Sequence, residues 1–305
     1  MSSSCSLSLY FLFRETGDSG GPIFQWIGDR WEQVGLVSFS EEGCATAGYP
    51  DVFTRMTFFH DWIQAHIRDT NQTTTSDNQT ALSRVLYECN PYGSECGCSR
   101  RNVVLSPSTI VESEDALPYT WTMVVSIRVA TTNEHICSGT ILGSFFILTA
   151  AHCLTNRSAS DLIIEAGMYY LSEINVTVRQ VDRFYIHPNY TVYAKQYIND
   201  IAILHLLLPL DAYKDKNIAR TCLSSTDQPL EETAQRPPNG TSLVITGWNI
   251  TNRTISHGPR IVQQAEVFAI DAELSNCSTR DNQSQFCVGR FENMTSNILT
   301  SRLIC

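Results

Sequence analysis

Short apolar runs separated by polar and turn-forming residues make up most of the chain. Around the turn-like Gly28-Asp29-Arg30, apolar residues occur at 23–24 and 34–39. Further runs follow at 52–54, 122–129, 138–142, 146–149, 162–166, 176–181, 201–206 and 243–247. Many short strands at close spacing predict an all-β barrel or sandwich. One segment differs from this pattern. Its apolar residues are spaced so that they would lie on one face of a helix, and they are Phe58, Phe59, Trp62, Ile63 and Ile67.

Composition excludes several classes of partner. With 305 residues, 43% of them hydrophobic, the chain can form one large domain or two smaller ones. A formal charge of −10 argues against nucleic acid as a partner, and the chain has no basic run that would favour an anionic membrane surface. It has no apolar run of about 18 residues, so we expect no membrane-spanning helix.

Glycosylation sequons indicate the compartment. The chain contains eleven Asn-x-Ser/Thr sequons where roughly three would arise by chance, which predicts an extracellular, secreted glycoprotein. They begin at Asn71, Asn78, Asn156, Asn175, Asn189, Asn239, Asn249, Asn252, Asn276, Asn282 and Asn293.

The cysteine content agrees with an oxidising compartment. Eleven cysteines leave at least one without a partner in the same chain. Cys89, Cys96 and Cys98 have a spacing that suits either a metal site or disulfides. Because no histidine lies near them, disulfides are favoured and no metal is expected.

Three motifs carry the candidate chemistry. The first is Gly17-Asp18-Ser19-Gly20-Gly21-Pro22, in which glycines allow a tight turn with an exposed hydroxyl and backbone N–H groups aimed at an oxyanion. A plain Gly-rich loop is the alternative interpretation. The other two motifs are Thr149-Ala150-Ala151-His152-Cys153 and Asn199-Asp200-Ile201-Ala202-Ile203-Leu204.

Together these motifs resemble those of the trypsin/chymotrypsin-like serine proteases. The resemblance implies that Ser19 is the nucleophile, His152 the general base and then acid, and Asp200 the carboxylate that orients the imidazole. It also implies that the N–H groups of Gly17 and Ser19 form the oxyanion hole. The fold it implies has two six-stranded antiparallel β-barrels and a C-terminal-type helix at about 55–68.

The order of the motifs is inverted, because the family places its serine last. Residues 16–68 resemble the final quarter of such a domain, and 110–290 resemble its first three quarters. Between them, 69–109 are expected to form a glycosylated linker and a Cys-rich pro-segment. We assign 1–15 as an uncertain leader and leave 291–305 unassigned. The chain is a circular permutant if its halves pack together, or a fragment spanning two tandem domains if they do not.

The resemblance implies further roles. A new amino terminus at Ile110 would pair with Asp18, although Thr109 replaces the basic residue expected before it. Disulfides would join Cys137 to Cys153, Cys277 to Cys287 and Cys98 to Cys222.

Substrate contacts are implied at four positions. Ser38, Phe39 and Ser40 would pair with the substrate backbone, with Ser40 in place of the usual glycine. Asp51 would lie at the base of the specificity pocket and favour Lys or Arg side chains.

These features predict a secreted serine endopeptidase that hydrolyses peptide bonds through an acyl-enzyme, with no cofactor. Its expected partners are protein or peptide substrates and protease inhibitors. An alternative is an inactive protease homologue, or a polyprotease fragment, that acts as a binding glycoprotein. A purely structural glycoprotein would need none of the three motifs.

Overall fold

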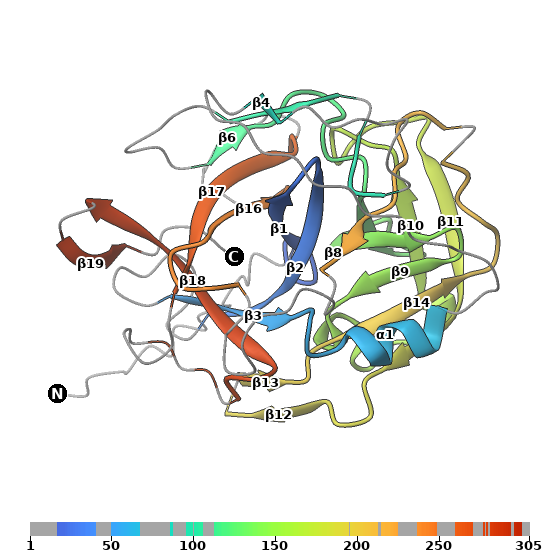
Figure 1. Ribbon diagram of the computed structural model, residues 1–305. Coiled ribbons are helices and arrows are strands. Elements are labelled where there is room, and N and C mark those ends of the chain that lie inside the picture. Colours follow the sequence, from blue (N-terminus) through green and yellow to red (C-terminus); the bar gives the residue numbers. More distant parts are fainter. Residues whose placement is uncertain are drawn as a thin grey trace, which may run out of the picture.

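Two β-barrels lie side by side in the computed structural model (Figure 1). The structure describes residues 17–40, 50–67, 86–87, 96–99, 101–105, 113–194, 196–212, 215–224, 237–248, 260–270, 277, 279, 281–293 and 296–300.

Six antiparallel strands from the middle of the chain close the first barrel. In barrel order they are β10 (Leu162–Ala166), β11 (Thr177–Ile186), β14 (Ala202–Leu206), β9 (Phe146–Thr149), β8 (His135–Gly143) and β7 (Val124–Val129). Its core consists mainly of aliphatic side chains, among which Ile127, Ile147, Ile164 and Leu204 are fully buried. Burial of this kind is the main driving force for closing the barrel.

The second barrel draws its strands from both ends of the chain. The N-terminal segment supplies β1 (Pro22–Ile27), β2 (Arg30–Phe39) and β3 (Asp51–Arg55), and the C-terminal segment supplies β16 (Ser242–Gly247), β17 (Gln263–Ile270) and β18 (Gln285–Asn293). β1 pairs with β16, β3 pairs with β18, and the β17–β18 pairing closes the ring. Two six-stranded antiparallel barrels are the predicted fold class, which is therefore confirmed.

The core of the second barrel is shared between the two segments. Phe53 and Phe286 are both buried, and their ring centroids lie 5.7 Å apart. Gly35 on β2 leaves room for the Phe286 ring, because a Cβ at this position would lie 2.7 Å from a ring carbon. The two segments therefore form one packed unit in this structure.

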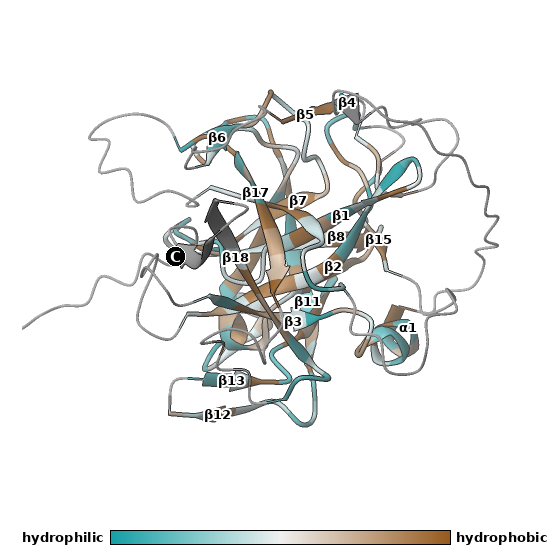
Figure 2. Ribbon diagram, turned by 60° about the vertical axis from the view of Figure 1, so that its left-hand side comes forward, coloured by the Kyte–Doolittle hydropathy of each residue, from teal (hydrophilic) through white to brown (hydrophobic). Residues whose placement is uncertain are grey.

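The predicted helix is present but shorter than expected. We expected it at about 55–68, whereas α1 spans His60–Ile67. Arg55 instead ends β3, because it pairs with Gly35 and its guanidinium donates to the Gln285 carbonyl at 2.7 Å. α1 buries Ile63 and carries both hydrophobic and hydrophilic colours in Figure 2. Among the described residues, no helix is long and apolar enough to cross a membrane.

Short elements complete the fold. They are β4 (Leu86–Tyr87), β5 (Val103–Val104), β6 (Glu114–Asp115), η1 (Ala151–Leu154), η2 (Ala159–Asp161), β12 (Thr191–Tyr193), β13 (Gln196–Ile198), β15 (Cys222–Leu223) and β19 (Ser296–Thr300). β19 pairs with the end of β18, so a hairpin extends into the region that we had left unassigned.

One predicted disulfide is wrong. Cys222 is bonded to Cys96, not to Cys98. Gly97 explains this choice, because its N–H donates to the Arg220 carbonyl and its carbonyl accepts from Trp31, which holds Cys96 beside Cys222. Cys98 takes part in a different disulfide. The bonds Cys137–Cys153 and Cys277–Cys287 are present.

The shared core makes a stability prediction. Phe286→Ala should lower the free energy of unfolding by about 3–5 kcal/mol, because it removes a large side chain packed against the other segment. Denaturant unfolding of the chain measures this, and a double-mutant cycle with Phe53→Ala should show coupling of about 0.5 kcal/mol or more. Phe58→Ala is the control, since Phe58 is 46% exposed, and should change stability by only about 0.5 kcal/mol. Additive effects of Phe53→Ala and Phe286→Ala would contradict a common core.

Candidate active site

The register between two strands of the first barrel brings His152 and Asp200 together. Ala202 at the start of β14 pairs with Thr149 at the end of β9. The antiparallel pairing therefore places Asp200, just before β14, next to His152, just after β9. Asn199 makes the turn into Asp200 with a φ of 53°, a left-handed conformation that Asn tolerates better than most residues.

Several donors surround the Asp200 carboxylate, which is 1% exposed. Oδ2 accepts from Ser38 Oγ at 2.6 Å and lies 2.7 Å from His152 Nδ1, while Oδ1 accepts from the His152 backbone N–H at 2.8 Å. A carboxylate held by several donors stays in its acceptor form. Asp200 therefore accepts a hydrogen bond from the N–H group at His152 Nδ1, and His152 Nε2 is left to accept a hydrogen bond from another group.

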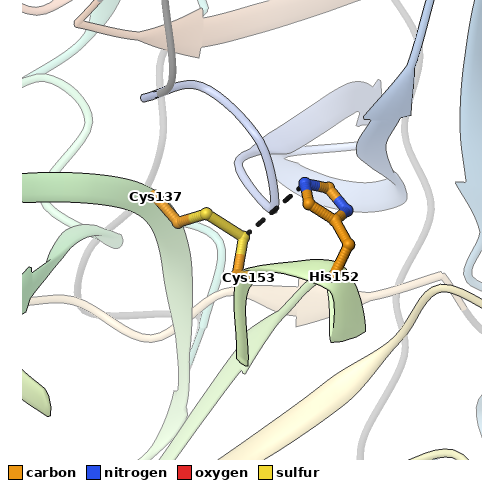
Figure 3. A group of neighbouring side chains, drawn as sticks. All are labelled: Cys137, His152 and Cys153. Atoms are coloured by element: carbon orange, nitrogen blue, oxygen red, sulfur yellow. Dashed lines mark hydrogen bonds between the residues drawn. A yellow bond between two sulfur atoms is a disulfide. The ribbon is translucent and has the colours of Figure 1, made fainter. Parts of the chain in front are cut away.

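The His152 ring is held from two sides. The Tyr197 ring stacks on it, with centroids 4.6 Å apart and planes inclined by 10°. On another side lies the Cys137–Cys153 disulfide, with Cys153 Sγ 3.9 Å from His152 Nε2 (Figure 3). The three side chains are close enough to suggest a metal site. Because the two sulfurs are bonded to each other, they are not the thiolates that such a site requires.

The Ser19 loop packs between the barrels. Gly20 has a φ of 76° and its N–H donates to the Val37 carbonyl at 2.9 Å. A Cβ on Gly20 would collide with Thr149 Oγ1, so only glycine fits. The Ser19 carbonyl accepts from the Ser138 N–H at 3.0 Å. The described residues include no hydrogen bond between Ser19 Oγ and His152 Nε2.

A chain of buried and half-buried polar groups supports the Gly17 carbonyl. This oxygen accepts from Ser138 Oγ at 2.7 Å and lies 3.0 Å from His135 Nε2. His135 Nδ1 lies 2.7 Å from Ser126 Oγ, which accepts from Arg128 Nε at 3.0 Å. The Ser126 hydroxyl therefore donates to His135 Nδ1. Because a carbonyl oxygen can only accept, the proton of His135 lies on Nε2, which donates to the Gly17 carbonyl.

Asp18 is buried beside the same loop. Its Oδ1 accepts from the Trp248 N–H at 3.0 Å, and Gly247 has no space for a Cβ because Asp18 lies against it. The proposed partner of Asp18, Ile110, lies outside the described residues. The pairing of Asp18 with Ile110 therefore stays a prediction.

The predicted substrate-contacting residues lie along the end of β2 and the start of β3. Ser38 is 3% exposed and its hydroxyl binds Asp200, while Phe39 and Ser40 are partly exposed. Asp51 is also 3% exposed, and its Oδ1 has no hydrogen-bond partner among the described residues. Burial raises the pKa of Asp51 to about 7, against the opposing effect of a hydrogen bond from Ser40.

Sequence reasoning missed three supporting residues. No motif in the sequence singled out His135, Tyr197 or Ser138. Their roles depend on contacts with residues more than 40 positions away in sequence, so no local motif marks them.

Comparisons with known proteins agree with this architecture. A family model described as Trypsin matches residues 13–63 and 110–297, which is more than half of the chain. One relative is mouse "Transmembrane protease serine 11C", which is 30% identical over 59% of this chain and 38% of its own length. Another is "Ovochymase" of Halocynthia roretzi, which is 32% identical over 53% of this chain and 10% of its own length. "Trypsin delta" of Drosophila erecta is 31% identical over 50% of this chain and 55% of its own length. The matches thus span between a tenth and just over half of these relatives.

The half-buried His135 makes a pH prediction. Burial, followed by the charge of Arg128, lowers the pKa of His135 to about 3. Between about pH 6.5 and pH 3 the unfolded chain binds a proton at His135 that the folded chain does not. The contribution of His135 to the free energy of unfolding should therefore decrease by about 1.4 kcal/mol for each unit by which the pH is lowered through this range. Urea unfolding at pH 7 and pH 4.5 measures this.

His135→Gln is the matched variant for this test. Gln keeps a hydrogen-bond donor for the Gly17 carbonyl but does not titrate. As the pH falls, the wild type should therefore lose more free energy of unfolding than this variant does. A difference that is independent of pH would contradict a neutral His135 in the folded chain.

Proposed function

The chain belongs to the trypsin family of serine proteases, and we propose that it is a secreted serine endopeptidase acting through an acyl-enzyme. The observation that carries the proposal is the hydrogen-bonded pair of His152 and the buried Asp200, next to a glycine-flanked Ser19 loop. Proteases of this family act on protein or peptide substrates. Secretion of this chain is supported by its sequons and disulfides.

In the proposed mechanism each residue has one role. Asp200 holds the proton on His152 Nδ1, so that Nε2 can take the proton of Ser19 Oγ as this oxygen attacks the scissile carbonyl. The N–H groups of Gly17 and Ser19 stabilise the oxyanion. His152 then protonates the leaving amine, and water hydrolyses the acyl-enzyme in the same way. We expect the Ser19–His152 hydrogen bond to form when substrate binds, because catalytic hydrogen bonds often reach their final geometry only in the complex.

We further propose that the substrate side chain entering the pocket is cationic. Asp51 offers a buried carboxyl oxygen without a hydrogen-bond partner in the described part of the chain. A Lys or Arg side chain would supply both the missing donor and the opposite charge. Because the pKa of Asp51 is about 7, such a ligand must displace a proton below that pH.

The segments 16–68 and 110–290 are proposed to act as one permuted protease domain. The pairing of β1 with β16 and of β3 with β18 supports this assignment over two unrelated fragments. Ser19 and the His152–Asp200 pair would then form one site within one chain. The alternative of an inactive binding homologue is distinguished by the labelling experiment below.

A fluorophosphonate probe tests the nucleophile. The gel-filtered monomer should be labelled on Ser19, before or after mild proteolysis, because the probe reacts with an activated serine. Mass spectrometry of the modified peptide identifies the site. Ser19→Ala should abolish labelling, and Asp200→Asn should slow it by about 10²-fold or more. Absence of label under both conditions would favour the inactive homologue.

Benzamidine, a small amidinium cation, tests the pocket. Its affinity should rise about tenfold per pH unit up to about pH 7 and then level off, because only the ionised Asp51 carboxylate attracts it. Inhibition of probe labelling measures the affinity. Asp51→Asn should bind benzamidine weakly with a flatter profile, and the difference between the two profiles isolates the contribution of Asp51. Parallel profiles for the two proteins would rule out Asp51 as the cation site.

A further inference from the structure

Two sequons lie on either side of a single hydrogen bond near His152. The Tyr190 hydroxyl is hydrogen-bonded to the Thr155 side chain. Thr155 directly precedes Asn156, and Tyr190 directly follows Asn189. These two asparagines begin the sequons Asn156-Arg157-Ser158 and Asn189-Tyr190-Thr191. Segments that are 33 residues apart in sequence therefore place two acceptor sites beside each other.

Ring contacts connect this place to the imidazole. The Tyr190 ring lies 6.4 Å from the Tyr197 ring, which stacks on His152 at 4.6 Å. Asn199, next to Asp200, donates through its side-chain amide to the Asn189 carbonyl at 2.9 Å. Both sequons thus adjoin residues that hold the His152–Asp200 pair, whose imidazole is 13% exposed.

Both acceptor asparagines are exposed. Neither side-chain amide donates a hydrogen bond within the described residues, in contrast to Asn199, whose amide is used structurally and which begins no sequon. Asn189 lies two residues before the hairpin of β12 and β13, which stands at the lower edge of Figure 1. On β12, Val192 is 53% and Tyr193 61% exposed. Exposed apolar side chains of this kind offer a surface against which an attached group can pack.

We propose that Asn156 and Asn189 carry N-linked glycans that restrict the approach of folded proteins to His152. The oligosaccharide donor is a lipid-linked diphosphate of the secretory pathway. The side-chain Nδ2 forms a bond to the anomeric carbon, the bond from that carbon to the diphosphate breaks, and the amide proton leaves with the lipid diphosphate. Bulky sugars on both sides of Tyr190 then exclude globular partners, while extended peptide segments still reach the site.

This inference rests on the proposed function for its consequence but not for the modification. Glycopeptide mapping of the protein secreted from mammalian cells should find sugar at Asn156 and Asn189, and it needs no activity. Unmodified asparagines at both positions would overturn the proposal. If glycans are found but the small fluorophosphonate does not label Ser19, the proposed function fails and the modification stands.

The restriction is measured with two probes of different size. One is the free fluorophosphonate, and the other is the same warhead on a short peptide tether attached to a folded carrier protein. Removing both glycans, with Asn156→Gly and Asn189→Gln, should leave the rate with the small probe unchanged and raise the rate with the carrier about tenfold. Glycine suits position 156, where φ is 60°. An unchanged ratio of the two rates would refute the restriction.

Asn239 provides the matched control. It is an exposed sequon asparagine that precedes β16, whose opposite end at Gly247 packs against Asp18. The strand alone separates these ends by about 17 Å. Asn239→Gln should leave the ratio of rates unchanged. Enzymatic removal of the glycans from the folded wild type repeats the test without any substitution, so a folding defect of the variants cannot account for the result.

Discussion

The pairing of β1 with β16 is the constraint on which the rest of the structure depends. It joins Ile23 to Ile245, residues from opposite ends of the chain, and thereby closes a barrel that neither end could close alone. Open strand edges are prone to non-native pairing, so closure also removes a source of aggregation. Because Ser19 lies just before β1, the same pairing brings the Ser19 loop against Ser138 in the first barrel.

Buried polar groups transmit this arrangement to the candidate site. The Gly17 carbonyl is held by His135 and Ser138, and His135 is oriented by Ser126. Buried polar groups that are fully hydrogen-bonded rigidify a structure, whereas loss of one partner leaves the other at a high desolvation cost. The proposed oxyanion donors therefore depend on side chains that would contact no substrate.

Errors in the sequence-based expectations have local physical causes. The apolar spacing of 58–67 predicted a helix correctly, but it did not show that Arg55 is retained by β3 through the Gln285 carbonyl. The sequence alone does not distinguish Cys96 from Cys98 as the partner of Cys222. The hydrogen bonds of Gly97 place Cys96 beside Cys222. No apolar run predicted the strands β17 and β18, although both begin within 110–290, the segment that resembles the protease family.

The sequence by itself determined the all-β class, the family and the candidate triad, because these depend on local periodicity and on motifs whose residues are contiguous. Tertiary structure decided that the two segments share one barrel, since strand pairing over more than 200 residues leaves no mark in local composition. It also decided the stacking of Tyr197 on His152 and the burial of Asp51. A ring contact and a desolvated carboxyl arise only when distant segments exclude water together.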